Sequence, residues 1–404
     1  MIKHSRITRC LVALLLLIAL GATTAFSAAD NLFSTQTKLV DPNPAEVGNF
    51  GVAVAIDGNT AVVTRLANSF TQVPGAAFIY TRSGTTWTLQ QTLTEQDNEP
   101  MADDGYGFSA ALHGDTLVVG AIGDSTAAFA AGAAYVYVRN GTTWSLQQKL
   151  TAGDPVSSSN FGIGVDVQDD TIVVGGHLAD SAYVFHRDGG VWTQQQKLVG
   201  DGTPEQSFGI SVAISGQTIA VGAASHSSPG ANFAGSVYVF VNDGSSWNQQ
   251  QQFTTHDVAT DQNLGFTVGI SGNTIVASAP GESVGAHSKG AVYIFDRNGT
   301  TWSQTKRIVE QGGNKVDAYG LRVAIEGNTI VVGNIANSTV ATFAGAGEVY
   351  MRNGNAGWSL KYLLTASDGA SLDFLGATVA ISGNTIMLGA PQKNDFHGAV
   401  YIFQ

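Results

Sequence analysis

The stretch FGISVAISGQTIAVGA, residues 208–223, contains the pattern that decides the fold. After Phe208 and Gly209, large side chains at Ile210, Val212 and Ile214 alternate with small ones, which is the period-two pattern of a β-strand. Neither face of this strand carries a charge, so we expect a sheet that is covered on both sides. SGQT then places a glycine at the first central position of a two-residue hairpin, as a type II′ turn requires. TIAVGA is the predicted return strand.

The same pattern occurs seven times along the chain. Each copy opens with an aromatic residue or leucine followed by glycine, and successive glycines are 56, 55, 47, 56, 55 and 56 residues apart. These opening pairs are Phe50-Gly51, Tyr106-Gly107, Phe161-Gly162, Phe208-Gly209, Leu264-Gly265, Tyr319-Gly320 and Leu375-Gly376. A nearly constant period of this length predicts a repeat fold.

Each unit is predicted to contain two further strands. A loop of variable length leads to a third strand such as GSVYVF (235–240), and a tight hairpin such as RNGTTW (297–302) leads to a fourth. All six tryptophans of the protein lie at the start of this fourth strand, six residues before an aliphatic residue or phenylalanine. Such periodic placement on strands favours packing between repeats over a platform for stacking a ligand.

The two ends of the chain complement each other. The last unit ends at GAVYIFQ (398–404), which is a third strand without a fourth, whereas near the N-terminus Phe33 precedes Leu39 by the same six residues. We therefore predict that residues 33–40 lie beside residues 400–403. The expected fold is all-β: a seven-bladed β-propeller of four-stranded antiparallel blades, closed by the N-terminal strand that completes the last blade.

The first 29 residues have the layout of a cleaved secretory signal peptide. Lys3, Arg6 and Arg9 precede an apolar run at 11–20, which is about half of the roughly 20 residues that a membrane-spanning helix needs. We expect residues 30–404 to form one propeller domain, secreted or in the cell envelope, with no transmembrane segment in the mature chain. The only cysteine, Cys10, lies in the leader, so disulfides and thiolate sites are not expected.

The charge balance limits the classes of partner. Three of the 19 Lys and Arg residues and none of the 31 Asp and Glu residues lie in the leader, so the mature chain has a formal charge of 16 − 31 = −15. Nucleic acid is therefore not expected as a partner, because binding its phosphates requires basic surface.

The Phe-Gly openings, together with second strands that end in LGAP (388–391), SAP (278–280) or VGA (221–223), resemble the FG-GAP repeat of bacterial secreted proteins. That repeat also builds the seven-bladed head of integrin alpha subunits, and the resemblance covers residues 33–404. It implies calcium, since many such repeats carry a D-x-D-x-D-G loop between the first two strands. Here that loop is absent, and each turn offers at most one carboxylate (Asp57, Asp115, Asp170 or Glu326). No metal or other cofactor is therefore expected from the residues themselves.

Candidate binding residues fall into two groups. The connections between second and third strands, together with those between blades, should emerge on one side of the propeller, called here the loop face. Four of these loops carry a phenylalanine that could contact a partner or tuck down onto the ring: Phe70, Phe129, Phe233 and Phe343. The other group interrupts the repeat: Asp166 and Arg322 replace small residues of first strands, Arg65 and His177 replace small residues just after second strands, and Arg352 is interpreted as replacing a third-strand aromatic.

Asp166 and Arg322 would face the central channel from nearly opposite blades, where they could interact with each other or be solvated by the channel. No catalytic constellation stands out in the sequence. We expect a monomeric, non-catalytic binding or adhesion module that recognises an extracellular protein or glycan through the loop face. The alternative is an extracellular carbohydrate-active enzyme, a lyase or hydrolase. A pocket that brings Arg65, His177, Asp166 or Arg322 to one centre would favour the enzyme.

Overall fold

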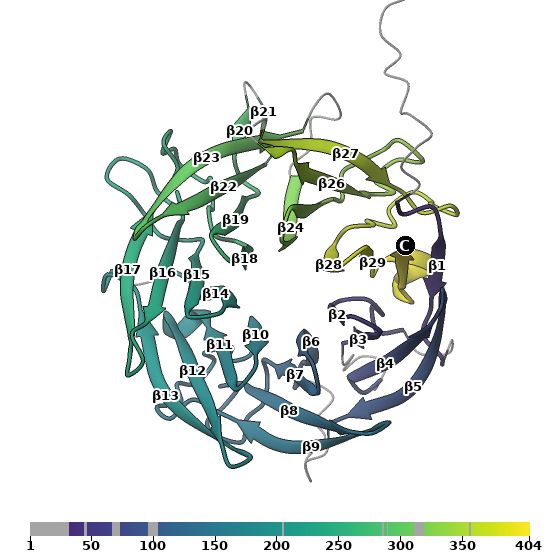
Figure 1. Cartoon of the computed structure of the whole chain (residues 1–404), viewed down its shortest axis with the longest axis horizontal. Helices are drawn as coiled ribbons and strands as arrows, with labels where there is room; N and C mark the ends of the chain where they lie inside the picture. The colour runs from purple at the N-terminus through teal and green to yellow at the C-terminus, as the bar shows by residue number, and fades with distance from the viewer. Residues whose placement is uncertain are drawn as a thin grey trace, which may run out of the picture.

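The computed structural model describes residues 32–43, 47–66, 73–95, 104–203, 206–284, 287–288, 290–310, 319–354 and 357–404. The predicted signal peptide and Phe70 lie outside these residues. Seven four-stranded antiparallel sheets stand in a ring around a central axis (Figure 1). The predicted all-β, seven-bladed propeller is confirmed.

Each blade is described from its innermost to its outermost strand. Blade 1 contains β2 (Val54–Asp57), β3 (Thr60–Arg65), β4 (Ala76–Ser83) and β5 (Thr86–Thr94). Blade 2 contains β6 (Tyr106–His113), β7 (Thr116–Ala121), β8 (Ala133–Asn140) and β9 (Thr143–Leu150). Blade 3 contains β10 (Val165–Gln168), β11 (Thr171–Gly176), the short 3-10 helix η1 (His177–Ala179), β12 (Ser181–Asp188) and β13 (Val191–Val199).

The remaining blades repeat this order. Blade 4 contains β14 (Phe208–Ser215), β15 (Thr218–Ala223), β16 (Ser236–Asn242) and β17 (Trp247–Phe253). Blade 5 contains β18 (Val268–Ser271), β19 (Thr274–Ala279), β22 (Ala291–Asn298) and β23 (Thr301–Val309), with the two-stranded β20 (Ser283–Val284) and β21 (His287–Ser288) in its loop. Blade 6 contains β24 (Tyr319–Glu326), β25 (Thr329–Asn334), β26 (Ala346–Arg352) and β27 (Trp358–Leu364). Blade 7 contains β28 (Thr378–Ser382), β29 (Thr385–Ala390), the short helix α2 (Lys393–Phe396), β30 (Ala399–Phe403) and β1 (Gln36–Leu39).

Blade 7 is shared between the two ends of the described chain. Strand β1 pairs antiparallel with β30, in a register that places Gln36 opposite Phe403 and Leu39 opposite Val400 (Figure 1). Phe33 is buried, packs edge-on against Tyr362 with 5.2 Å between ring centroids, and belongs to the hydrophobic cluster between blades 6 and 7. The predicted closure by the N-terminal strand is therefore confirmed.

The Phe-Gly pair has a physical explanation in the contact between neighbouring blades. Gly209 has φ +91°, and a Cβ added to it would lie 2.3 Å from the carbonyl oxygen of Ser181 in the preceding blade. Glycine tolerates this conformation and this approach, whereas an L-residue does not. Phe208 is fully buried and packs against the rings of Tyr238 and Phe240. The glycine thus permits the close approach, and the aromatic side chain fills the space beside it.

The hydrophobic core lies between blades. The cluster between blades 3 and 4, for example, joins Val173 and Val184 to Val212, Val221 and Phe240. The cluster between blades 7 and 1 includes side chains of β1 and β30 as well as of blade 1. Burial of one large apolar side chain contributes about 1.5–3 kcal/mol, so an unclosed ring would leave a substantial apolar face in water.

The six tryptophans are all buried, which supports the packing interpretation. Trp192 shows how they are held: its backbone N–H donates to Gln148 Oε1 at 2.8 Å, and its carbonyl accepts from Gln148 Nε2 at 2.7 Å. Gln91, Gln196 and Gln251 hold the tryptophan of the following blade in the same way. These glutamines link the outer strands of adjacent blades.

Arg352 corrects one sequence interpretation. Its register partner is Trp358, over which its guanidinium stacks at 4.9 Å, just as Arg187 pairs with and stacks on Trp192. Arg352 therefore occupies the regular arginine position of the blade and does not replace an aromatic residue. The residue that departs from the repeat is Glu348, which stands where blade 4 has Tyr238. Blade 6 has two glycines here, Gly345 and Gly347, and aligning Gly347 instead of Gly345 with Gly235 of blade 4 shifts the apparent register by two residues.

Candidate functional site

The strand order separates two faces of the ring. The connections between first and second strands in every blade, and those between third and fourth strands in blades 1 to 5, are tight turns at one end, called here the hairpin face. The remaining connections emerge at the opposite end, which is the loop face. Exposed large apolar side chains in the loop-face connections are Val40, Phe129, Val156, Leu178, Phe233, Val258, Val340, Leu372 and Phe396. On the hairpin face, within the described residues, Val191 is exposed in this way.

The phenylalanines of the loop face differ in their exposure. Phe129 is 76% exposed and Phe233 is 49% exposed, so neither tucks down onto the ring. Their backbones are nevertheless fixed: the carbonyl of Phe129 accepts from the Ser158 N–H at 2.8 Å, and that of Phe233 accepts from the Asn263 N–H at 3.0 Å. Phe343 is half-buried and stacks on Phe374 at 6.2 Å. The loops therefore present two apolar side chains to solvent from backbones bonded to the next blade.

Arg65 is part of a buried structural contact. Its Nη1 donates to Asp41 Oδ2 at 2.9 Å, and its Nη2 donates to the Pro74 carbonyl at 3.1 Å. The guanidinium also lies over the Phe78 ring, 5.4 Å from the centroid. Since both charged side chains are about 95% buried, this pair holds the loops of blade 1 and offers no open cation.

His177 lies in η1, the short loop of blade 3. Its imidazole is half-buried, its Nδ1 has no hydrogen-bond partner in the described residues, and burial lowers its pKa. The neighbouring Leu178 is exposed. The ring is therefore a neutral side chain at the edge of the loop face.

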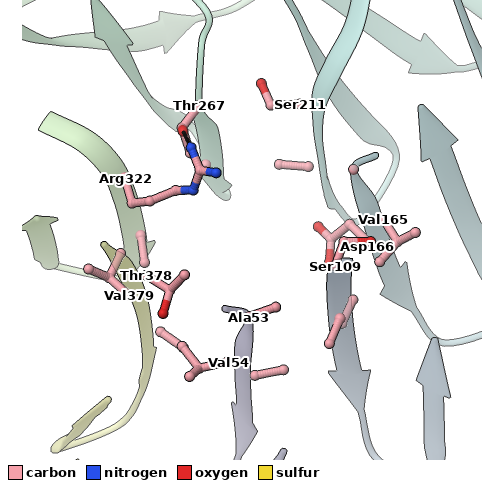
Figure 2. A pocket seen from close by; sticks show the side chains of 18 of the residues that line it. Ala53, Val54, Ser109, Val165, Asp166, Ser211, Thr267, Arg322, Thr378 and Val379 are labelled. Carbon is pink, nitrogen blue, oxygen red and sulfur yellow. Dashed lines mark hydrogen bonds between the residues drawn. The ribbon is translucent and has the colours of Figure 1, made fainter. Parts of the chain in front are cut away.

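Asp166 and Arg322 line a cavity of about 450 Å³ on the propeller axis, whose walls come from the innermost strands of all seven blades. Figure 2 shows them on opposite walls. Asp166 Oδ2 accepts from the backbone N–H of Ile214 in the next blade at 2.7 Å, and Oδ1 accepts from the Val167 N–H at 2.9 Å. Burial raises the pKa of Asp166 to about 6. Within the described residues no ion pair joins Asp166 to Arg322.

The four residues that interrupt the repeat are thus divided between two places. Asp166 and Arg322 share the axial cavity, while Arg65 and His177 lie at the loop ends of two different blades. The convergence that would have favoured an enzyme is not present among these four residues.

Three carboxylates outside the candidate binding residues named above lie together in the loop-face connections. One oxygen each from Glu95, Asp104 and Asp124 lie within 4.8 Å of one another. The Tyr135 hydroxyl oxygen lies 2.6 Å from Glu95 Oε1 and 3.0 Å from Asp124 Oδ2, so its one proton is donated to either carboxylate. Lys149 Nζ lies 2.5 Å from Asp124 Oδ2. Among the described residues, these three carboxylates are the group that could bind a hard cation. The ammonium group of Lys149 already neutralises Asp124.

Other blades use the same place differently. The loop position held by Asp124 in blade 2 is held by His226 in blade 4 and by Lys393 in blade 7, each three residues after its second strand. Lys393 is buried and its Nζ lies 2.6 Å from Asp373 Oδ2. The side chain at this loop position therefore makes a polar contact in each of these blades, with a different residue type each time. This favours a structural role for the three carboxylates, in fixing the loops, over a cation site.

The comparison with protein families gives the class of this protein. The FG-GAP repeat matches residues 87–137, 144–185, 192–240, 247–295, 302–351 and 358–403, which is more than half of the chain. The protein belongs to the FG-GAP repeat family. Each matched unit begins at the tryptophan of one blade and ends in the third strand of the next, so every repeat spans a boundary between blades.

Solved structures with a similar fold are only distantly related in sequence. "Structure of U3-55K" is 12% identical with a TM-score of 0.56, over 92% of this chain and 98% of that one. "Crystal structure of RRP9 WD40 repeats" is 11% identical with a TM-score of 0.57, over 92% of this chain and 97% of that one. A search of curated proteins found no match. In the described part of the chain, no helix is long and apolar enough to cross a membrane.

Proposed function

We propose that this FG-GAP propeller is a secreted or cell-surface, non-catalytic binding module that recognises another protein through its loop face. The observation that carries the proposal is the exposure of apolar side chains on that face, above all Phe129 and Phe233. Aromatic residues are enriched at the centres of protein interfaces, where charged residues are depleted.

The rigidity of the presenting loops supports the same function. Because the backbones at Phe129 and Phe233 are hydrogen-bonded to the following blade, ordering these loops at an interface costs little conformational entropy. The net acidic character of the chain would speed association with a basic partner. A glycan partner would instead call for more polar groups around the aromatic rings.

The test is a binding screen of residues 30–404 against an array of extracellular proteins and, in parallel, a glycan array. The double variant Phe129→Ser/Phe233→Ser removes the two exposed rings, and Val191→Ser on the hairpin face is the matched control. Loss of an interface aromatic typically costs about 2 kcal/mol or more, so protein binding should weaken at least roughly tenfold in the double variant and stay unchanged in the control. Hits confined to the glycan array, or protein binding that the double variant retains, would refute this proposal.

A further inference from the structure

The axial cavity has the properties of a small-molecule site that the loop-face function does not use. Its volume of about 450 Å³ falls within the range of roughly 300–1,000 Å³ that is typical of ligand pockets. Its walls are mainly aliphatic and small side chains, and all of the lining residues belong to the described part of the chain. Of these lining residues, Asp166 and Arg322 are the ionisable ones.

The fold does not require an arginine at position 322. In four blades the equivalent residue is a serine or threonine, whose hydroxyl donates to a backbone carbonyl of the next blade: Ser109 to Gly162 at 2.7 Å, Ser211 to Gly265 at 2.9 Å, Thr267 to Leu321 at 2.9 Å and Thr378 to Gly51 at 2.8 Å. Blades 1 and 3 have Ala53 and Gly164 at this position. Four blades therefore use this position for a hydrogen bond to the next blade, and two blades do without one. Neither use requires the arginine that blade 6 has.

Among the described residues, no carboxylate pairs with the guanidinium of Arg322. Its Nη1 donates to the Leu321 carbonyl at 3.2 Å and lies 3.5 Å from Thr267 Oγ1, while Nε and Nη2 have no partner in the described residues. The guanidinium lies over the Phe266 ring, 5.5 Å from the centroid, and burial lowers its pKa. A guanidinium presents its N–H groups as a planar fork that matches a carboxylate. Here the edge formed by Nε and Nη2 is available to a ligand.

Asp166 on the opposite wall does not supply the missing anion. Both of its oxygens accept backbone N–H groups, and Figure 2 shows it across the cavity from Arg322. It also restricts which anions the cavity can accept, because a second negative charge would meet a carboxylate in a site with one arginine and no other cation. A singly charged ligand is therefore favoured over a phosphate or sulfate dianion.

We propose that the axial cavity binds a small monocarboxylate with an apolar body. The carboxylate accepts from the Nε and Nη2 groups of Arg322, and the apolar body lies against Phe266 and the aliphatic walls. Each added methylene that leaves water strengthens binding, so affinity rises with chain length until the cavity is filled.

The experiment is calorimetric titration of residues 30–404 with butyrate, hexanoate, hexylammonium and inorganic phosphate. Hexanoate should bind with a stoichiometry of one and more tightly than butyrate, whereas hexylammonium and phosphate should not bind. Arg322→Ser should lower hexanoate affinity by roughly a hundredfold or more, because it removes two charge-assisted hydrogen bonds. It should leave the melting temperature unchanged or raised, since the new hydroxyl reproduces the blade contacts of Ser109 and Ser211. Arg322→Lys keeps the charge without the fork and should fall between the two.

Several results would overturn the assignment. These are no hexanoate binding by the wild type up to about 10 mM, equal affinity in Arg322→Ser, or binding of phosphate as tight as that of hexanoate. The loop-face double variant Phe129→Ser/Phe233→Ser should bind hexanoate like the wild type. Failure of this inference would therefore leave the proposed protein-binding function untouched, and the reverse holds as well.

Discussion

Closure of the ring by β1 can be tested with a single substitution. Leu39 is 7% exposed and packs between blades 7 and 1, in a cluster that includes Phe50, Val54, Val400 and Ile402. Leu39→Ala removes most of this side chain and leaves a cavity between two blades, which the surrounding strands cannot readily close. Substitutions of buried leucine by alanine cost about 2–5 kcal/mol, the larger values belonging to sites that cannot collapse.

The repeat provides a matched control. Leu93 occupies the same position in β5, is 2% exposed, and packs between blades 1 and 2 in the middle of the chain. If β1 is an ordinary member of blade 7, Leu39→Ala and Leu93→Ala should lower the free energy of unfolding by amounts within about 1 kcal/mol of each other. Urea unfolding followed by tryptophan fluorescence measures both, with equal m-values showing that the same surface is exposed.

The contrary result is as clear. If Leu39→Ala costs less than about 0.5 kcal/mol while Leu93→Ala costs 2 kcal/mol or more, β1 does not carry the closure and the reasoning fails. Removal of residues 1–40 is the stronger perturbation and should cause unfolding or aggregation, because Tyr401 and the other β30 residues lose their covering strand. A synthetic peptide of residues 32–43 added to the truncated chain should restore the folded state.

Three further predictions concern buried groups. Burial raises the pKa of Asp166 from 3.8 to about 6, so stability falls as the pH rises through this window; Asp166→Asn should flatten urea-unfolding free energies between pH 4 and 6, whereas an unchanged pH profile would contradict this. Lys393→Met should cost about 3–5 kcal/mol in the same assay because it leaves Asp373 buried without its cation, and Lys393→Met/Asp373→Leu should recover more than half; no recovery would show that the pair is not the cause. Gly209→Ala should cost at least about 2 kcal/mol because its Cβ would meet a carbonyl of the preceding blade, whereas Gly216→Ala, in an open turn with φ +57°, should cost about 1 kcal/mol; equal losses would contradict the close-approach explanation.

Most of the architecture could be predicted from the sequence because its determinants are local and repeated. Alternation of large and small residues, as in Ile210 to Ile214, specifies a strand wherever it occurs, and glycine at a hairpin position such as Gly216 specifies the turn. The incomplete seventh unit and the unpaired segment around Phe33 indicated closure, because an open ring would leave the apolar faces of two blades in water.

The contacts of the candidate sites were not readable in this way. Asp166 bonds to the Ile214 N–H of the next blade, and Arg65 pairs with Asp41 across two loops. The sequence marked Asp166 and Arg65 as departures from the repeat but not their partners. Arg352 was misplaced because Gly347 was aligned with the glycine that precedes the other third strands, and strand pairing reveals that Gly345 holds that position.

The sequence by itself therefore determined the number of blades, their strand order and the closure, since these follow from periodicity and from the need to bury apolar faces. The tertiary structure alone decided that Phe129 and Phe233 are exposed to solvent and that three carboxylates meet in the loop-face connections around blade 2. It also shows that Arg322 has no carboxylate partner among the described residues. These features depend on distances between residues of different blades and on the local backbone of single loops, which are not repeated and so leave no period in the sequence.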